Sequence, residues 1–408
     1  MVTSAHNENY NLKYFLMLMQ SVLNDTPAPA PEEKVDWNKL YDIAVKHSLA
    51  GMFYYAIEKL DDSQKPKEDF MPYLEQMYRE QIVTDLNLTL ETHRMLEELS
   101  SAGIKCLPVK GINTKADYPV PHLRTMSDVD ILCKAQQRLK AEEIFLKNGY
   151  IKEGVGEKDT SYRKEEILHY ELHTKLITEE SPAYDYFDNI WERVTFKDNS
   201  NIASMTLEDT YIYMLEHLAN HIAFGGAGIR MYMDVYVFLK KNGDKLNREY
   251  VDKVLTEISL ADFEKKTILI SDNWFSGREE IVADSDYALF ILDSCTYGRA
   301  SVTFLSDNLR NHQGESAAKN GFKRIIRKVF PKLSWMRLRF KVVDKLPLLY
   351  PIFVPVYLFN RAFISRDIQT KNLGNYFTSS DSEEAKELMA VFTSLGLEKR
   401  IRGNYERI

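Results

Sequence analysis

Two aspartates separated by one residue, Asp128 and Asp130, are the residues best suited to metal-dependent chemistry in this sequence. They lie in an alternating run, SDVDILCK (127–134), which predicts a strand whose every second side chain points to the same face. Neighbouring carboxylates repel unless a cation lies between them, and Mg²⁺ prefers such oxygen ligands. The pair therefore predicts a Mg²⁺ site, with Val129 and Ile131 pointing into the core. A solvated Asp-x-Asp at a strand end is the alternative.

Residues on either side of the pair favour a site for a phosphate-bearing ligand. Lys110 and Gly111 end an apolar run (104–111); the glycine lets the backbone approach a phosphate and the lysine can neutralise it. Arg124 comes just before the acidic strand, where it could meet a triphosphate. These residue types predict a nucleotide-binding role.

A third acid follows on a later strand-like run, HYELHTKL, where His169, Glu171 and His173 share one face. Two metal ions held by three carboxylates are a common arrangement for in-line phosphoryl chemistry. Catalysis of that kind consists mainly of positioning and charge neutralisation. Glu171 would complete the metal site or act as the base for an acceptor hydroxyl, and His173 would line the same cleft.

Together these motifs resemble an uncharacterised bacterial nucleotidyltransferase family within the DNA-polymerase-β-like superfamily. The resemblance spans about 104–240 and is carried by Val109-Lys110-Gly111, Tyr118-Pro119, the run Arg124 to Leu132 with Ser127 inside it, Tyr170-Glu171-Leu172-His173, and Leu207-Glu208-Asp209 with His217, His221, Arg230 and Asp234. Lys110-Gly111 stands where the wider superfamily has Gly-Gly or Gly-Ser, and the third acid is Glu where Asp is commoner.

The resemblance implies a small mixed sheet and transfer of a nucleoside monophosphate from an NTP, with release of pyrophosphate. It assigns catalysis and one or two Mg²⁺ ions to Asp128, Asp130 and Glu171. It assigns nucleotide binding to Lys110, Gly111, Arg124 and Ser127. The acceptor could be a protein, an RNA, an antibiotic or a sugar.

Two residue pairs downstream each have two interpretations. His217 and His221 lie one helical turn apart and off the apolar stripe of their helix, so they line a cleft, bind a metal or face solvent. Arg230 and Asp234 form the polar stripe of an otherwise apolar helix, IRMYMDVYVFL. They could pair with each other as a structural salt bridge or line the nucleotide or acceptor cleft.

The elements that must position these residues divide the 408-residue chain into four predicted regions. Apolar spacings of three and four residues over 9–24, 36–60 and 70–101 predict an N-terminal helical subdomain, 1–102. Runs at 104–111, 127–134, 160–164 and 167–177, with a helix over 139–150, predict an α/β core, 103–200. A helical domain, 201–320, opens at the capping box Thr206-Leu207-Glu208-Asp209. The fold class is therefore α+β.

The last region, 321–408, contains a basic, aromatic stretch, 321–366, with eleven Lys/Arg and one acid. It could contact nucleic acid or anionic lipid; packing of its aromatics on the acidic remainder of the chain is favoured instead. The net charge of −7 excludes a general nucleic-acid binder, and three scattered cysteines indicate reduced thiols. The apolar run 346–359 is too short and too rich in proline to span a membrane, so a cytoplasmic protein is expected.

Two other functions remain open. Sugar-nucleotide glycosyltransferases also hold a metal with Asp-x-Asp, but they usually place a multi-stranded nucleotide-binding domain before it. The first hundred residues here predict helices. A catalytically inactive module that binds a nucleotide or a partner protein is the second alternative, against which the retention of all three acids speaks.

Overall fold

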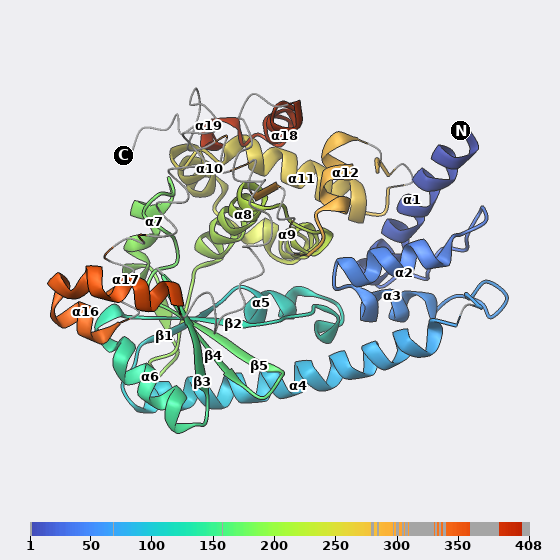
Figure 1. Ribbon diagram of the computed structural model, residues 1–408. Helices are drawn as coiled ribbons and strands as arrows, with labels where there is room; N and C mark the ends of the chain where they lie inside the picture. Colours follow the sequence, from blue (N-terminus) through green and yellow to red (C-terminus); the bar gives the residue numbers. More distant parts are fainter. Residues whose placement is uncertain are drawn as a thin grey trace.

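A computed structural model describes residues 2–278 except 68 and 157, 281–283, 285–296, 340–359 and 383–401, with single residues between 298 and 337. A five-stranded mixed sheet lies between a long helix and a bundle of helices (Figure 1). This arrangement confirms the α+β class.

Four helices precede the sheet: α1 (Val2–Asn24), α2 (Trp37–Lys46), α3 (Ala50–Ile57) and α4 (Met71–Ser101). The predicted helical pattern over 36–60 is divided between α2 and α3, because Ser48 adopts a positive φ of 55° that a helix cannot contain. The side chain of Asp36 caps α2 by accepting a hydrogen bond from the backbone N–H of Lys39. The helical character predicted for the first hundred residues is confirmed.

The sheet has the order β1-β2-β5-β4-β3. Its strands are β1 (Cys106–Val109), β2 (Val129–Cys133), β3 (Ile151–Val155), β4 (Asp159–Lys164) and β5 (Leu168–His173). Only β2 and β5 pair in parallel; the other neighbours are antiparallel. The sequence did not predict β3, an edge strand where Ile151 is exposed and a bulge shifts the register near Gly154.

The two faces of the sheet bury different partners. Val129, Ile131 and Cys133 pack with Tyr170 and with apolar residues of α4 and α6 (Arg138–Lys147). This packing confirms that Val129 and Ile131 point into the core. The opposite face, which carries the acids, is turned toward the bundle α8–α11 in Figure 1.

The loops between these elements hold short structures: α5 (Gly111–Thr114), α7 (Tyr184–Asp188), the 3₁₀ turns η1 (Lys115–Asp117), η2 (Pro121–Leu123), η3 (Ala135–Gln137) and η4 (Ile190–Glu192), and a two-stranded sheet of β6 (Thr195–Phe196) and β7 (Ala203–Ser204).

The helical bundle consists of α8 (Leu207–Phe224), α9 (Ile229–Asn242), η5 (Gly243–Lys245), α10 (Arg248–Glu257), α11 (Ala261–Phe275) and α12 (Asp286–Asp293). Thr206 caps α8 by accepting a hydrogen bond from the backbone N–H of Asp209, as its position in the capping box predicted. The domain boundaries at 102, 200 and 320 stay predictions.

Near the C-terminus, α18 (Glu383–Ser394) and α19 (Glu398–Ile401) pack on the bundle. Arg400 donates to the carboxylate of Glu216, to Asn220 and to Ser181, which fixes α19 against α8. Glu216 is fully buried and Arg400 is 7% exposed. The contact is therefore a buried ion pair on the helix that carries the two candidate histidines.

The helices α16 (Lys341–Lys345) and α17 (Tyr350–Phe359), the turn η6 (Pro347–Leu349) between them and the preceding residues Met336, Arg337 and Phe340 form a small module within the basic, aromatic stretch. Much of the remaining stretch, with Phe322 and Trp335, lies outside the described residues. The module's aromatics Phe340, Tyr350 and Phe353 do pack, but in a cluster of the module's own. Among the described residues, no helix combines the length and apolarity needed to cross a bilayer.

We expect Arg400→Ala to lower the free energy of unfolding by about 3–5 kcal/mol, because it leaves the buried carboxylate of Glu216 without its cation. Chemical denaturation measures the change. The matched control is Lys399→Ala, an exposed neighbour on the same helix, which should change stability by less than about 0.5 kcal/mol. Equal stability of the two variants would contradict the buried pair.

Candidate active site

The parallel pairing of β2 with β5 brings the acids together. Asp130 lies opposite Glu171 in the strand register, with both side chains on the face turned toward the bundle. Asp128 comes one residue before β2 and accepts a hydrogen bond from the hydroxyl of Ser127, 3.1 Å away. Asp130 and Glu171 thus lie side by side on one face of the sheet, and Asp128 directly precedes the strand that carries Asp130.

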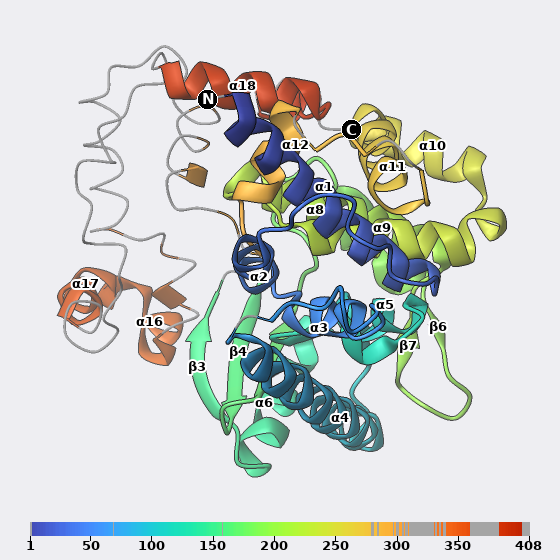
Figure 2. The same cartoon turned by 90° about the vertical axis from the view of Figure 1, so that its right-hand side faces the viewer.

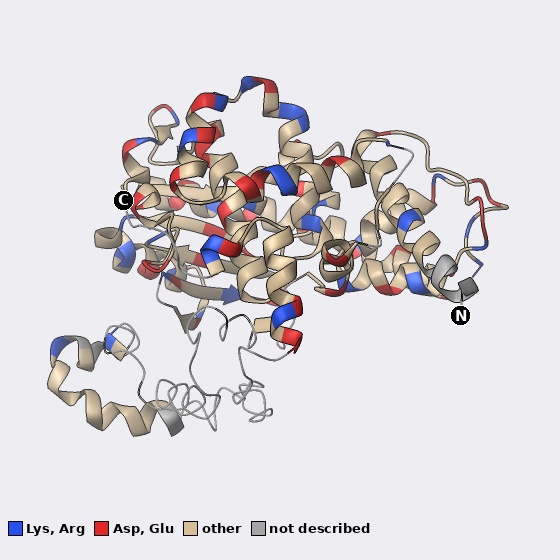
Figure 3. Cartoon of the chain, turned by 90° about the horizontal axis from the view of Figure 1, so that it is seen from above, with Lys and Arg blue, Asp and Glu red and all other residues tan. Residues whose placement is uncertain are grey.

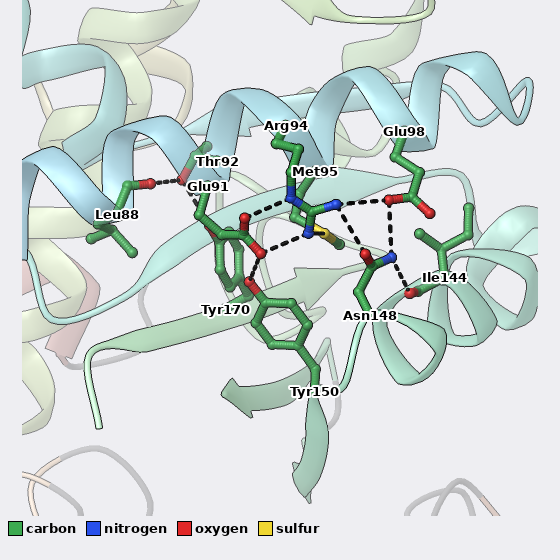
Figure 4. A network of polar contacts seen from close by, with 10 residues as sticks. All are labelled: Leu88, Glu91, Thr92, Arg94, Met95, Glu98, Ile144, Asn148, Tyr150 and Tyr170. Carbon is green, nitrogen blue, oxygen red and sulfur yellow. Dashed lines mark hydrogen bonds and ion pairs between the residues drawn. The ribbon is translucent and has the colours of Figure 1, made fainter. Parts of the chain in front are cut away.

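The other face fixes β5 in this position. The hydroxyl of Tyr170 lies 3.0 Å from that of Thr92 on α4. Figure 4 shows this contact within a network in which Glu91 accepts from Tyr150 and α4 is tied to α6 through Asn148. Because Tyr170 precedes Glu171 in the strand, these bonds fix the backbone that presents the acid.

An ammonium and an imidazole group meet the buried carboxylate of Asp130. The ammonium of Lys110 lies 2.6 Å from its Oδ1, and Nε2 of His173 lies 2.7 Å from the same oxygen. The same His173 nitrogen is 3.3 Å from Oε2 of Glu171, so the ring bridges the two acids. Asp130 is 3% exposed and His173 is fully buried, which makes this compensation necessary.

The charges of this cluster shift one another's pKa values. Burial disfavours ionisation of Asp130, but Lys110 and His173 outweigh it and hold the pKa of the carboxyl well below its usual range. Burial also opposes the charge of His173, yet hydrogen bonds to Asp130 and Glu171 raise its pKa. Asp128 behaves oppositely: burial first, then the charges of Asp130 and Glu171, raise its pKa.

Lys110 is held in an unusual backbone conformation. Its φ of 58° and ψ of −132° are strained for a residue with a Cβ atom, and they make a sharp turn between β1 and α5. That turn directs the side chain across the sheet edge to Asp130. Strain of this kind is concentrated at functional sites in proteins.

The donor atoms present fit a divalent cation. One ligand atom each of Asp130, Glu171 and His173 lies within 4.8 Å of the others. Carboxylate oxygens are the ligands that Mg²⁺ prefers, and an imidazole nitrogen can add to them. The group includes His173, which the predicted set of Asp128, Asp130 and Glu171 did not contain, and it does not include Asp128.

A cavity of ≈ 480 Å³ opens over the acids, within the range of about 300–1,000 Å³ that is usual for small-molecule sites. Helix α8 forms one wall with side chains spaced three and four residues apart, namely Thr210, Tyr213, Met214, His217, Asn220, His221 and Phe224. The predicted site residues Lys110, Gly111, Arg124, Ser127, Asp128, Asp130, Glu171, His217, His221, Arg230 and Asp234 all line this cavity. His173 lies buried behind them.

The two histidines of α8 face the cavity without a charge. Burial and then the charge of Lys110 lower the pKa of His217 well below its usual value, and the same causes lower that of His221 to about 4. Their rings meet edge to face, with centroids 4.4 Å apart. Unprotonated imidazoles in such a wall can accept a hydrogen bond or a proton from a ligand.

Arg124 and Asp234 form a pair that the sequence did not predict. The guanidinium donates to both carboxylate oxygens of Asp234, at 3.2 and 2.7 Å, and Tyr118 donates to Asp234 at 2.7 Å. Arg230, the expected structural partner of Asp234, instead donates to the backbone oxygen and hydroxyl of Thr125. Both arginines therefore fix the loop before the acid pair to α9.

Gly111 makes this packing possible. A Cβ atom added there would overlap the guanidinium of Arg124 and approach the sulfur of Met126 to 2.9 Å. The sequence suggested that this glycine lets backbone approach a phosphate; the structure shows that it also admits the arginine.

Lys158 is the main cavity residue that sequence reasoning missed. It lies in the turn between β3 and β4, and its ammonium forms no ion pair with another described residue. Burial and then the charge of Lys110 lower its pKa. The β3–β4 hairpin brings Lys158 to the acids, and its first strand was not predicted. A single lysine in a turn gives no sequence signal of its own.

Comparison with known proteins supplies one match. A family model described as an uncharacterised nucleotidyltransferase matches residues 33–276, which is more than half of the chain and includes every acid and cation of the cavity. No curated protein and no solved structure matches the chain.

We expect Gly111→Ala to destabilise the protein by about 1–3 kcal/mol, because the added methyl group displaces the Arg124 guanidinium from its place against Asp234. Thermal unfolding measures the loss. Gly154→Ala on β3 is the control, since a Cβ atom there meets its nearest neighbour at 4.0 Å. A larger effect at Gly154 than at Gly111 would refute this role.

Proposed function

We propose that this protein binds an NTP with Mg²⁺ in its cavity, in the cytoplasm, and transfers the nucleoside monophosphate to an acceptor hydroxyl. The chain belongs to the uncharacterised nucleotidyltransferase family, which supports the proposal. The observation that carries the proposal is the register that sets Asp130 opposite Glu171 beneath a cavity of nucleotide size. The acceptor belongs to one of four classes: a protein, an RNA, an antibiotic or a sugar.

The acids are assigned to the metal. Asp128, Asp130 and Glu171 would hold Mg²⁺, with His173 fixing the two strand-borne carboxylates from behind. When bound, the ion supplies charge neutralisation of the triphosphate and polarisation of the α-phosphate. The pKa of Glu171 is lowered, mainly by the hydrogen bond from His173. Glu171 is therefore better suited to binding the metal than to accepting a proton.

The cations of the cavity are assigned to the triphosphate. Lys158 is suited to a phosphate because it faces the acids with no ion pair of its own among the described residues. Lys110 and Ser127 line the same cavity. Arg124, committed to Asp234, acts as a positioning residue that holds the loop bearing Asp128.

The reaction is an in-line displacement. The acceptor oxygen forms a bond to the α-phosphorus, the bond from that phosphorus to the bridging oxygen of the β-phosphate breaks, and pyrophosphate leaves. The rings of His217 and His221 on the α8 wall can accept a hydrogen bond from the acceptor hydroxyl, whose proton passes to water. These roles place the acceptor against α8 and the triphosphate against β2 and the β3–β4 turn.

Two alternatives are separated by the products. A sugar-nucleotide transferase releases a nucleoside diphosphate, and both the helical N-terminal region and the family match argue against it. An inactive module binds Mg-NTP and never consumes it. Measurement of pyrophosphate release therefore distinguishes all three.

The direct test incubates the purified protein with each α-³²P-labelled NTP and Mg²⁺, with and without host lysate, and follows label and pyrophosphate. We expect transfer with one NTP, reduced by about 10²-fold or more in Asp130→Asn with the fold intact by circular dichroism, because a metal-binding carboxylate is lost. Glu153→Gln, a half-exposed acid of β3, should retain full activity. Full activity of Asp130→Asn would exclude the assignment.

Lys158→Ala should weaken binding of Mg-NTP by about tenfold or more without lowering stability, since it removes a charge directed at the phosphates. Isothermal titration with a non-hydrolysable NTP analogue measures the affinity. Lys147→Ala, an exposed lysine of α6 away from the cavity, serves as the control of equal charge change. Equal affinities for the two variants would remove Lys158 from the site.

A further inference from the structure

The module of α16, η6 and α17 has a core of its own. Its buried residues Met336, Val343, Val354 and Tyr357 pack on one another and on three partly buried aromatics, Phe340, Tyr350 and Phe353. They form a cluster separate from the two cores of the body. Figure 2 shows α16 and α17 standing apart from the sheet and the bundle.

An aliphatic ridge faces outward from this module. Leu348 on η6 is 93% exposed, and Ile352 and Val356 on α17 are 64% and 43% exposed. The spacing of four places Ile352 and Val356 on one face of α17. Leu346, 59% exposed, continues the ridge toward α16. A run of exposed aliphatic residues of this size marks a binding surface more often than ordinary solvent-facing structure.

Positive charge accompanies the ridge. The stretch 321–366 carries eleven Lys/Arg and one acid within a chain whose net charge is −7. Among its described residues, Lys345 adjoins Leu346 and is exposed, as is Arg337. Figure 3 shows α16 and α17 mainly in tan, with blue on α16, whereas the helices of the body mix red with blue. The described part of the module therefore combines an apolar surface with two exposed cations, Lys345 and Arg337.

We propose that this module docks the protein on the surface of an anionic lipid bilayer. The ridge of Leu348, Ile352 and Val356 enters the boundary between headgroups and acyl chains, and the bordering cations contact the headgroups. Helix α17 has 10 residues, half of what a span requires, so it lies along the interface.

The chemistry of the ridge argues for lipid over nucleic acid. Single-stranded nucleic acid is bound by aromatic side chains on which bases stack, and the module's aromatics are engaged in its own cluster. Aliphatic side chains gain nothing from a phosphate backbone, but they gain free energy on leaving water for acyl chains.

The test is sedimentation of the full chain with vesicles of phosphatidylcholine alone or mixed in equal parts with phosphatidylglycerol. We expect binding to the mixed vesicles, weakened by salt, and little binding to the neutral ones. The double variant L348S/I352S should bind the mixed vesicles with an affinity lowered by about tenfold or more, and its melting temperature should be unchanged. Lys345→Glu, which keeps the ridge, should also weaken binding to the mixed vesicles.

The control double variant V83S/L86S removes two exposed aliphatic side chains from α4, 57% and 56% exposed, and should bind like the unchanged protein. Failure of the full chain to bind mixed vesicles at low salt overturns the proposal. Equal losses in both double variants overturn it as well. The unchanged protein could instead bind an RNA oligonucleotide or self-associate without binding vesicles. If L348S/I352S then lost that binding, the ridge would be assigned to RNA or to a second copy of the chain.

Discussion

The structure depends on charge compensation around one buried carboxylate. Asp130 lies in a strand between apolar neighbours and is 3% exposed, a position that an isolated charge could not occupy. Lys110 and His173 approach one of its oxygens to 2.6 and 2.7 Å. The lysine reaches it only through a strained turn, and the histidine only through the parallel neighbour β5. The burial of this side chain therefore depends on both the order of the strands and the conformation of the loop at Lys110.

The rest of the fold holds that cluster from two sides. Helix α4 packs beneath the sheet, where Thr92 meets Tyr170 one residue before Glu171. Above it, α9 holds the loop before the acid pair through Asp234 and Arg124, while α8 supplies the opposite cavity wall. The cavity thus lies between the acidic strand pair and the histidines of α8, and the proposed function assigns the triphosphate to the first wall and the acceptor to the second. Family membership and geometry thus point to the same chemistry.

Local sequence patterns predicted much of this arrangement, because alternation and helical spacing report on which face of an element is buried. The strand with Asp130, which begins one residue after Asp128, the later strand with Glu171 and the capped helix with His217 all follow from such patterns. Pairings between distant residues do not. Arg124 and Asp234 are 110 positions apart, so the sequence offered Arg230 as the nearer partner. Lys158 and the edge strand β3 were missed because a bulged, half-exposed edge lacks clean alternation.

The proposed function requires the acids beneath the cavity to bind the divalent cation that accompanies the nucleotide. Anomalous diffraction from crystals grown with Mn²⁺ and a non-hydrolysable NTP analogue tests it most directly, because Mn²⁺ replaces Mg²⁺ at carboxylate sites. We expect anomalous density next to the carboxylates of Asp130 and Glu171, with the phosphates of the analogue directed toward Lys158. Analogue bound in the cavity with no metal at these acids, or metal bound elsewhere, would contradict it.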